Sequence, residues 1–232
     1  MQLHTFPDQQ TLVSALAEHL AAALRRDIAA QGRASLAVSG GSTPLPLFER
    51  LSELDIPWRN VLITLADERW VDASSPDSNE ALARRSLLRN RAAAATFIGL
   101  KTAAATAAAG TADCEARLAV LPRPFTAVIL GMGNDGHTAS LFPCAPQLVE
   151  AADLRCGRRC AALRPQTAPH ERISLTLPAL LDAREIILHI TGSEKKIVLE
   201  QALSAGPPEA MPVRFILRQQ AAPVAVYWSA KP

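Results

Sequence analysis

The sequence predicts an α/β protein with a mainly parallel sheet covered by helices on both faces, a Rossmann-like three-layer sandwich. Short apolar runs rich in β-branched residues alternate along the chain with segments of helical hydrophobic spacing. This alternation of strands and helices is typical of a parallel sheet. Polar segments follow the apolar runs, at the edge of the sheet where ligands bind in such folds. Because no repeat or long linker divides the chain, residues 1–232 are expected to form one domain.

The first half of the chain opens with a predicted amphipathic helix over residues 9–30, which Gly32 ends. A strand over 34–38 leads into a helix that reaches about Leu54, with Pro44 in its first turn. Either Ser42 or Thr43 is expected to cap that helix. The other elements expected here are a strand over 61–66, a helix from Ser78 or Asn79 to about Leu88, an alanine-rich helix with a loose connection over 92–110, and a helix near 112–121.

The second half begins with an apolar, β-branched run over 127–130 that predicts a buried strand. Residues 147–170 are less regular and are expected to hold a strand near 160–163 and loops. Residues 172–177 alternate as in a half-buried strand. The elements expected after them are a short helix from Pro178, a strand over 185–191, a helix to about Leu203, a break at 206–208 and a last strand over 224–228.

Composition limits the classes of partner. The 24 basic and 22 acidic side chains leave a net charge of only +2, and aromatic residues make up 4% of the chain. These values favour neither nucleic acid nor an anionic membrane as a partner. No apolar run has the length of a membrane span, and the N-terminus lacks the basic start and apolar core of a secretory signal. The expected location is the cytoplasm.

The cysteines do not form a recognisable metal motif. None of Cys114, Cys144, Cys156 and Cys160 belongs to a C-x-x-C pair, and Cys156, Cys160 and His170 are poorly spaced for zinc. Reduced thiols in a cytosolic protein are the simpler interpretation. The sequence therefore predicts no metal site.

Residues 125–143 are the most informative segment. The predicted strand over 127–130 is followed at once by three glycines, Gly131, Gly133 and Gly136. Such residues allow sharp turns and a close approach to a ligand. Asp135 and His137 then stand at the carboxyl end of the strand, and histidine exchanges a proton near neutral pH. The pattern predicts a catalytic loop, although a plain tight turn with a surface histidine stays open on residue types alone.

The same glycines also satisfy G-x-G-x-x-G, the dinucleotide-binding pattern, and Asp153 lies near the expected acidic position. That pattern needs a long helix after its last glycine. Pro143 and Pro146 would break such a helix. The pattern also has no use for a charged Asp-Gly-His corner, so we reject a dinucleotide site.

A second polar segment, Ser39-Gly-Gly-Ser-Thr-Pro44, joins a predicted strand to a helix. Backbone amides and hydroxyls at a helix N-terminus form an anion site that suits phosphate. No lysine follows the serine or threonine, so the segment is not a Walker loop. The residues expected to contact phosphate here are Gly40, Gly41, Ser42 and Thr43.

Charged residues also follow two other strands. Asp67 and Arg69 are spaced to point to the same side, and an arginine there can form paired hydrogen bonds with phosphate or carboxylate. A simple surface ion pair is equally consistent with that spacing. Lys195 precedes the helix after the strand over 185–191, and Lys196 competes with it for an anion-binding role.

Together these segments supply an anion site, several cations and a titratable histidine, which suits a phosphorylated small molecule that undergoes proton transfer. Ser39 and Ser42 do not lie in a G-x-S-x-G turn, so a serine triad is not expected. No cluster of carboxylates and histidines has the spacing of a metallohydrolase.

The segments that carry these residues resemble the 6-phosphogluconolactonases of the glucosamine-6-phosphate isomerase/6-phosphogluconolactonase family, whose order they follow. The matching segments are 39–44, 67–71, 78–79, 131–143, 172–178 and 192–195. The related deaminases share the Gly-Ser-Thr-Pro loop and Asp-Gly-His but typically continue into Asn-Glu-Pro, where this chain has Ser140-Leu-Phe-Pro143. Arg69 also replaces the deaminase tyrosine, and both departures favour the lactonase. Residues 147–170 do not align securely, so a ligand-binding residue there would be missed.

The resemblance implies a deaminase/isomerase-like fold and hydrolysis of 6-phospho-D-glucono-1,5-lactone to 6-phosphogluconate in the oxidative pentose phosphate pathway, with no cofactor or metal. It places His137 as general base, with Asp135 or Asp67 either orienting it or binding sugar hydroxyls. Amides near Gly131 and Gly133 are candidates to stabilise an oxyanion. The side chains implied to hold phosphate, with the loop over 39–43, are Arg69, Arg172 and Lys195.

Two other functions remain as alternatives. One is a sugar-phosphate aminohydrolase or isomerase of the same fold. The other is a sugar-phosphate sensor, which the lack of a helix-turn-helix extension or basic recognition helix disfavours. Whether the protein is a monomer or a homodimer stays open.

Overall fold

The computed structural model describes residues 1–230, and its larger sheet has seven strands. Every neighbouring pair in this sheet is parallel. In spatial order the strands are β1 (Gln2–Phe6), β10 (Val224–Ser229), β9 (Ile186–Thr191), β6 (Ala127–Leu130), β2 (Ala34–Val38), β3 (Val61–Leu65) and β5 (Thr96–Ile98). The central strands β2 and β6 are buried along their whole length, as expected for parallel strands covered on both faces.

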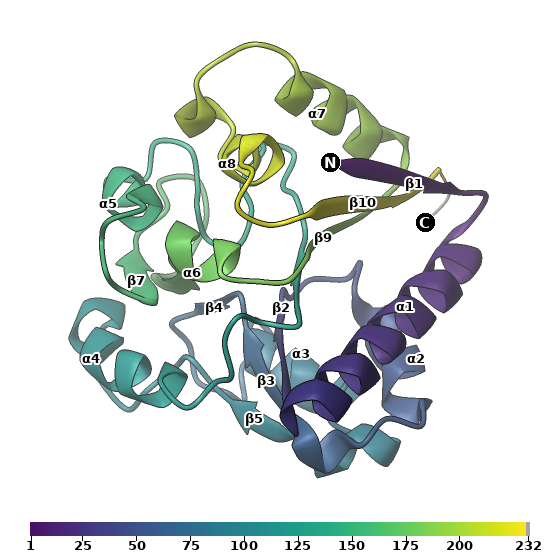
Figure 1. Ribbon diagram of the computed structural model, residues 1–232. Coiled ribbons are helices and arrows are strands. Elements are labelled where there is room, and N and C mark those ends of the chain that lie inside the picture. The colour runs from purple at the N-terminus through teal and green to yellow at the C-terminus, as the bar shows by residue number, and fades with distance from the viewer. Residues whose placement is uncertain (231–232) are drawn as a thin grey trace.

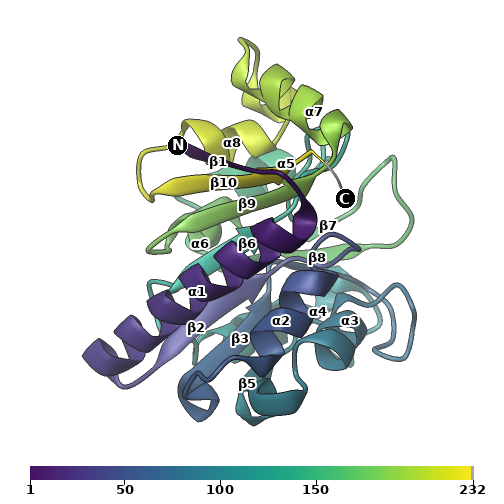
Figure 2. The same ribbon diagram turned by 90° about the vertical axis from the view of Figure 1, so that its right-hand side faces the viewer.

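Helices cover both faces of this sheet. On one side lie α1 (Gln9–Gln31), α2 (Leu45–Glu53) and α3 (Asn79–Ser86). On the other side lie α4 (Ala107–Leu118), α5 (Leu148–Ala152) and α6 (Leu177–Leu181) (Figure 1). The last helices, α7 (Ser193–Leu203) and α8 (Val213–Arg218), lie near β9 and β10. Figure 2 shows α1 running across the sheet, and the predicted fold class is confirmed.

The longest helix, α1, follows directly from its sequence. Asp8 caps its N-terminus by accepting a hydrogen bond from the Thr11 amide, and Gly32 ends it with a left-handed φ of 76°. Leucines at helical spacing, Leu12, Leu16, Leu20 and Leu24, are all 0% exposed. Burying one leucine side chain stabilises a fold by about 1.5–3 kcal/mol, so this face attaches the helix firmly to the sheet.

A second, antiparallel sheet was not predicted. It consists of β4 (Asp67–Arg69), β8 (Arg172–Leu175) and β7 (Cys160–Leu163), with β8 in the centre. The strand predicted near 160–163 is confirmed as β7. The strand predicted over 172–177 as half-buried ends at Leu175, and all four of its residues are buried. Both faces of β8 are therefore covered, whereas alternation of residue types predicted that only one would be.

The alanine-rich helix predicted over 92–110 is wrong. The chain there forms a 3₁₀ helix over Asn90–Ala94, then β5 beside β3, and α4 begins only at Ala107. Thr64 of β3 donates its hydroxyl hydrogen to the carbonyl of Ile98, which ties β5 to the sheet. β1 and α8 are further elements that the sequence pattern did not predict.

The order of strands creates a crevice at the carboxyl ends of β2 and β6. From β2 the chain continues to β3 and β5 on one side, whereas from β6 it continues to β9 and β10 on the other. Connections that leave two neighbouring strands in opposite directions open such a crevice, where ligands bind in α/β sheets. Over residues 1–230, none of the helices combines the length and apolar character that a membrane span requires.

Candidate active site

A cavity of about 680 Å³ opens at this crevice, and we call it the main cavity. It collects every residue that the sequence predicted for the site: Gly40, Gly41, Ser42, Thr43, Asp67, Arg69, Gly131, Gly133, Asp135, His137, Arg172 and Lys195. These residues come from the ends of β2 and β6, from the start of α7, and from β4 and β8 of the small sheet.

His137 is held by Asp135. The Nδ1 atom of His137 lies 2.5 Å from Oδ1 of Asp135, and the His137 backbone amide donates to the same oxygen at 3.0 Å. Partial burial acts to raise the pKa of Asp135, but these hydrogen bonds outweigh it and hold the pKa below the ordinary value. A carboxylate there accepts the Nδ1 proton, which leaves Nε2 as the basic nitrogen of the neutral ring.

The His137–Asp135 pair depends on Gly133. A Cβ at this position would lie 2.1 Å from Nδ1 of His137 and 2.5 Å from Oδ1 of Asp135, too close for either side chain to stay in place. The Gly133 amide donates to the carbonyl of His137 at 2.8 Å, so this amide, predicted as an oxyanion donor, is already engaged. Gly131 remains the candidate amide for that role.

The imidazole of His137 also stacks on Phe142. The two ring centroids are 4.0 Å apart with an interplanar angle of 22°. The guanidinium carbon of Arg172 lies 5.7 Å from the centroid of the same Phe142 ring, within the range of a cation–π contact. Phe142 therefore contacts both the proposed base and one of the proposed phosphate ligands.

Asp67 has a different partner from Asp135. The hydroxyl of Ser140 donates to Oδ2 of Asp67 at 2.5 Å, and Asp67 is 7% exposed. Of the two candidates left open by the sequence, Asp135 is thus the one that contacts His137. Burial lowers the pKa of Arg172, and the nearby carboxylate of Asp67 opposes this effect.

Arg69 is fixed by Asn79, which the sequence suggested as a possible helix cap and as part of a segment that matches the family. A terminal nitrogen of Arg69 donates to the Asp77 carbonyl at 2.7 Å and to Oδ1 of Asn79 at 2.8 Å. Asn79 in turn donates from Nδ2 to the Asp67 carbonyl. A Cβ at Gly40 would lie 1.9 Å from Oδ1 of Asn79, so this glycine is required for the close approach of the loop after β2.

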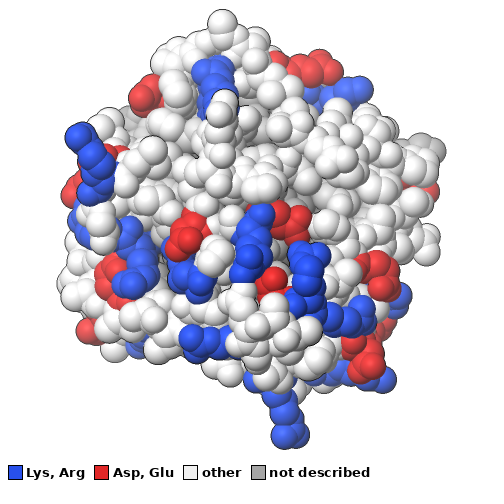
Figure 3. All heavy atoms as spheres, in the orientation of Figure 1, with Lys and Arg blue, Asp and Glu red and all other residues white. Residues whose placement is uncertain are grey.

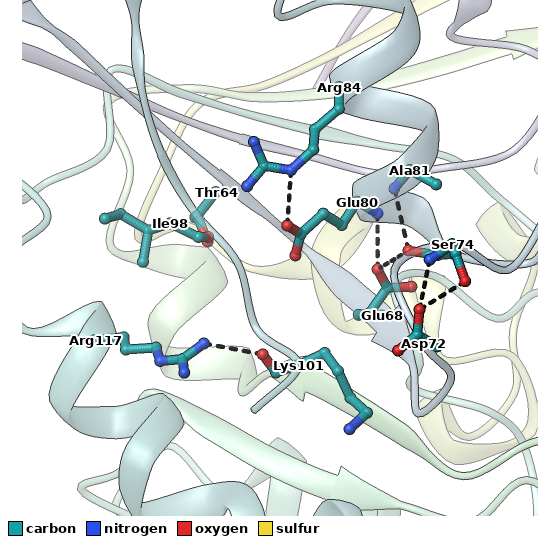
Figure 4. A network of polar contacts seen from close by, with 11 residues as sticks. Thr64, Glu68, Asp72, Ser74, Glu80, Ala81, Arg84, Ile98, Lys101 and Arg117 are labelled. Atoms are coloured by element: carbon teal, nitrogen blue, oxygen red, sulfur yellow. Dashed lines mark hydrogen bonds and ion pairs between the residues drawn. The ribbon is translucent and has the colours of Figure 1, made fainter. Parts of the chain in front are cut away.

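A buried carboxylate fastens β4 to α3. Glu68 accepts hydrogen bonds from the amides of Arg69, Asn79 and Glu80 and from the Ser78 hydroxyl, part of which is drawn in Figure 4. Burial raises the pKa of Glu68, although these hydrogen bonds oppose the rise. Ser78 also caps α3, as predicted. These contacts hold Arg69 and Asn79 at the wall of the main cavity.

Lys195 and Lys196 have different surroundings. The ammonium group of Lys195 lines the main cavity and donates to Oδ1 of Asn134, whereas that of Lys196 lies 4.7 Å from the centroid of the Trp228 ring. Burial lowers the pKa of Lys195, and the carboxylates of Asp135 and Glu194 oppose this effect. The geometry therefore favours Lys195 as the residue that meets an anion.

The N-terminus of α2 also borders the main cavity. Its cap is Pro44, and no side chain among the described residues makes a capping hydrogen bond to it. The prediction that Ser42 or Thr43 caps this helix is therefore wrong. The start of α2 offers few free amides, because the Leu45 amide donates to the Ser42 carbonyl at 3.3 Å and neither Pro44 nor Pro46 has an amide hydrogen. The anion-binding property that the sequence suggested therefore falls to the loop over 39–43, which lines the main cavity.

Unpaired polar atoms gather in the same place. Across residues 1–230, five buried side-chain polar atoms have no hydrogen-bond partner, and four belong to residues of the main cavity. These four are Oγ of Ser39, Nε of Arg172 and both ring nitrogens of His189. Since buried polar groups are normally paired, the cluster indicates a polar ligand.

Several residues of the main cavity were not predicted. Thr167 and Ala168 come from the segment over 147–170 that could not be aligned, and no sequence signal marks them. His189 carried one weak signal, as a single histidine in an otherwise apolar strand. No group of three or more metal-binding side chains occurs within residues 1–230.

A second cavity, of about 760 Å³, lies between α3, β5 and α4. Its basic side chains are bonded within the chain: Arg84 to Glu80 at 2.8 Å and Arg117 to the Lys101 carbonyl at 2.9 Å (Figure 4). On the face shown in Figure 3, acidic and basic side chains are interleaved rather than gathered into one patch of a single sign. We therefore take the main cavity as the candidate active site.

Comparison with known proteins decides the family. Residues 7–228 match the family described as glucosamine-6-phosphate isomerases/6-phosphogluconolactonase. The chain belongs to this family. A curated 6-phosphogluconolactonase of Rhizobium meliloti is 44% identical over 98% of each chain.

Solved structures agree with this assignment. The crystal structure of a 6-phosphogluconolactonase from Shewanella baltica is 48% identical, covers 99% of this chain and 98% of its own, and superimposes with a TM-score of 0.97. A monomeric glucosamine-6-phosphate deaminase, with 17% identity and a TM-score of 0.79, shares the fold. The resemblance predicted from the sequence is confirmed, and so is the expectation of an enzyme in this family.

Proposed function

We propose that the protein hydrolyses 6-phospho-D-glucono-1,5-lactone to 6-phosphogluconate in the oxidative pentose phosphate pathway, by histidine-assisted attack of water. The observation that carries the proposal is the main cavity itself, where an aspartate-held histidine shares one space with Arg69, Arg172 and Lys195. The lactonase names of the relatives support the same substrate.

In the proposed first step, Nε2 of neutral His137 accepts a proton from water while the water oxygen bonds to the lactone carbonyl carbon. General-base catalysis of this kind contributes about 10²–10⁴-fold. Asp135 stabilises the imidazolium that forms, since its carboxylate already contacts Nδ1. Negative charge grows on the carbonyl oxygen, where the amide of Gly131 is the candidate donor.

In the second step, the bond between the carbonyl carbon and the ring oxygen breaks, and the imidazolium returns its proton to that oxygen. The products are a free hydroxyl and a carboxylic acid, which ionises and releases one proton to the solution. The reaction consumes one water molecule and involves no oxidation or reduction. It uses only these side chains and the solvent.

The phosphate is the proposed handle for binding. Arg69, Arg172 and Lys195, together with the loop over 39–43, surround the space with cations and with the polar groups of that loop. Binding energy from this remote group would position the carbonyl next to His137. We assign Asp67 to a sugar hydroxyl, because its carboxylate is fixed by Ser140 and does not contact His137.

A pH-stat assay with freshly generated 6-phosphogluconolactone tests the proposal, with the spontaneous opening of the lactone subtracted. We expect catalysed release of one proton per lactone. Proton release no faster than the spontaneous rate, with tight binding of 6-phosphogluconate, would instead identify a sensor. Release of ammonia from glucosamine 6-phosphate would identify an aminohydrolase.

A further inference from the structure

One buried histidine of the main cavity has no role in the mechanism above. His189 lies in β9, is 3% exposed, and has no hydrogen-bond partner for Nδ1 or Nε2 among the described residues. A buried polar group without a partner gives up hydration and gains nothing in return. His189 is nevertheless one of the residues that line the main cavity. A ligand would reach its ring nitrogens only by displacing the atoms that now cover them, because both nitrogens are buried.

The neighbouring strand leaves space beside this ring. Leu130 of β6 pairs with Leu188 of β9, so Gly131 and His189 follow next in register and extend to the same face of the sheet. Gly131 has no positive φ, and a Cβ added to it would meet no atom within 4 Å. Neither backbone conformation nor packing requires glycine here, whereas close approach of a ligand does give a reason for it.

We propose that His189 is a specificity-determining residue that hydrogen-bonds to a hydroxyl group of the sugar in the space beside Gly131. The assignment rests on the proposed function, because it concerns the same site and a polyhydroxylated ligand. A neutral imidazole has one donor and one acceptor, and a hydroxyl group has both as well. Burial lowers the pKa of His189 to about 4, so the ring is neutral near pH 7 and offers phosphate no charge.

Calorimetric titration of the wild-type protein, three variants of the site and one control variant tests the assignment, with 6-phosphogluconate and inorganic phosphate as separate probes. His189→Leu replaces the imidazole by an apolar side chain of similar size. For this variant we expect the affinity for 6-phosphogluconate to fall about 10-fold to 100-fold. The affinity for inorganic phosphate should change less than about twofold, since phosphate does not use the ring. His189→Gln, which keeps a donor and an acceptor, should recover most of the lost affinity.

The third variant, Gly131→Ala, places a methyl group in the space beside the ring and should weaken 6-phosphogluconate binding without weakening phosphate binding. Tyr227→Phe is the matched control. Tyr227 pairs with His189 from β10 but does not line the main cavity. Its loss of one hydroxyl should leave both affinities unchanged. Equal weakening in Tyr227→Phe would overturn the assignment, because the effect would then come from the sheet as a whole.

The wild-type protein allows a test without any substitution. In ¹⁵N-histidine NMR spectra, the ring signals of His189 should shift when 6-phosphogluconate is added and stay in place with inorganic phosphate. If these signals do not move, or if His189→Leu binds 6-phosphogluconate as tightly as wild type, the assignment is wrong even where the wild type hydrolyses lactone. Absence of lactone turnover in the wild type would contradict the proposed function instead.

Discussion

A single missing side chain decides the geometry of the proposed base. With a Cβ at residue 133, the closest atoms of His137 and Asp135 would lie 2.1 Å and 2.5 Å away, far inside van der Waals contact. The two side chains are held by the hydrogen bond between these atoms, so neither can move aside without breaking it. The glycine is therefore required for the contact between His137 and Asp135, the proposed catalytic pair, and not only for the turn.

We expect Gly133→Ala to reduce kcat at least about 10-fold, because the displaced imidazole loses its alignment with the carbonyl. Inorganic phosphate binding should remain near the wild-type value. Steady-state kinetics and calorimetry measure the two effects, and thermal unfolding reports any loss of stability. Normal kcat in a variant with only a lower Tm would show that the pair tolerates the shift.

Removal of the imidazole itself should separate chemistry from binding. For His137→Ala we expect kcat to fall about 10²–10⁴-fold, since proton transfer to a positioned base is lost. Affinity for 6-phosphogluconate should change little, because the cations proposed to hold phosphate remain in the main cavity. His4→Ala, on the edge strand β1, is the control histidine and should keep wild-type kcat. Wild-type turnover in His137→Ala would remove this residue from the mechanism.

Residue type and spacing were sufficient to predict His137, Asp135 and Arg69, because each stands in a polar segment just after a strand. They were insufficient for His189, which lies inside an apolar strand and looks like part of the core. Asn79 shows a different limit. Its position predicted a helix terminus, and only the folded chain shows its amide bridging Arg69 and the backbone of β4.

At the scale of elements, the start of α7 shows that two lysines adjacent in sequence have different surroundings. Lys195 reaches the main cavity, whereas Lys196, one position later on the helix, turns toward Trp228. Consecutive helical residues point about 100° apart, so only one of two adjacent lysines can face a given site.

Lys195→Ala should weaken inorganic phosphate binding about 10-fold to 100-fold, the usual effect of losing a charge-assisted hydrogen bond. Lys196→Ala is the matched control and should bind phosphate as the wild type does. Because burial lowers the pKa of Lys195, the difference between wild type and Lys195→Ala should shrink as the pH rises toward that pKa. Calorimetric titration at several pH values measures it. A larger loss in Lys196→Ala would show that the other lysine contacts the anion.

The elements that the sequence failed to predict are short strands whose stability is not local. β4 and β5 have three residues each, and β4 is entirely polar, so neither carries a hydrophobic period. Their partners lie far along the chain: β4 pairs with β8 and β5 with β3. Long helices and buried strands such as α1 and β6 have a hydrophobic pattern within their own sequence, and their ends were predicted to within a few residues.

At the scale of the whole molecule, the topology explains why distant segments meet. The carboxyl ends of β2 and β6 adjoin where the chain reverses its direction across the sheet, and the small sheet adds Asp67, Arg69 and Arg172 from a separate layer. The first part of this arrangement was predictable from a parallel sheet. The second was not, because the antiparallel sheet forms between segments about a hundred residues apart.

Two histidines outside the proposed catalytic step, buried His189 and exposed His19, make the stability of the whole fold depend on pH with opposite signs. Burial lowers the pKa of His189 to about 4 from the ordinary 6.5, so the unfolded chain binds a proton at this position before the folded protein does. The contribution of neutral His189 to the free energy of unfolding is complete above pH 6.5 and is lost as the pH falls toward 4. For His19, a hydrogen bond to Glu185 raises the pKa, so its contribution is present at low pH and is lost as the pH rises through the folded value.

Urea unfolding at pH 7.5 and pH 4.5 of the wild type, His189→Leu and His19→Gln measures these contributions. Between the two pH values, the wild type should lose about 2–3 kcal/mol more of its free energy of unfolding than His189→Leu, which is most of the equivalent of the pKa difference at His189 because pH 4.5 is still above the folded pKa. The wild type should lose less than His19→Gln over the same interval, because protonation of His19 favours the folded state. The carboxylates that titrate in this range are common to the wild type and His189→Leu and cancel in that comparison, whereas His19→Gln also removes the partner of Glu185. Parallel pH dependence in wild type and His189→Leu would mean that His189 takes up its proton in the folded protein near its ordinary pKa.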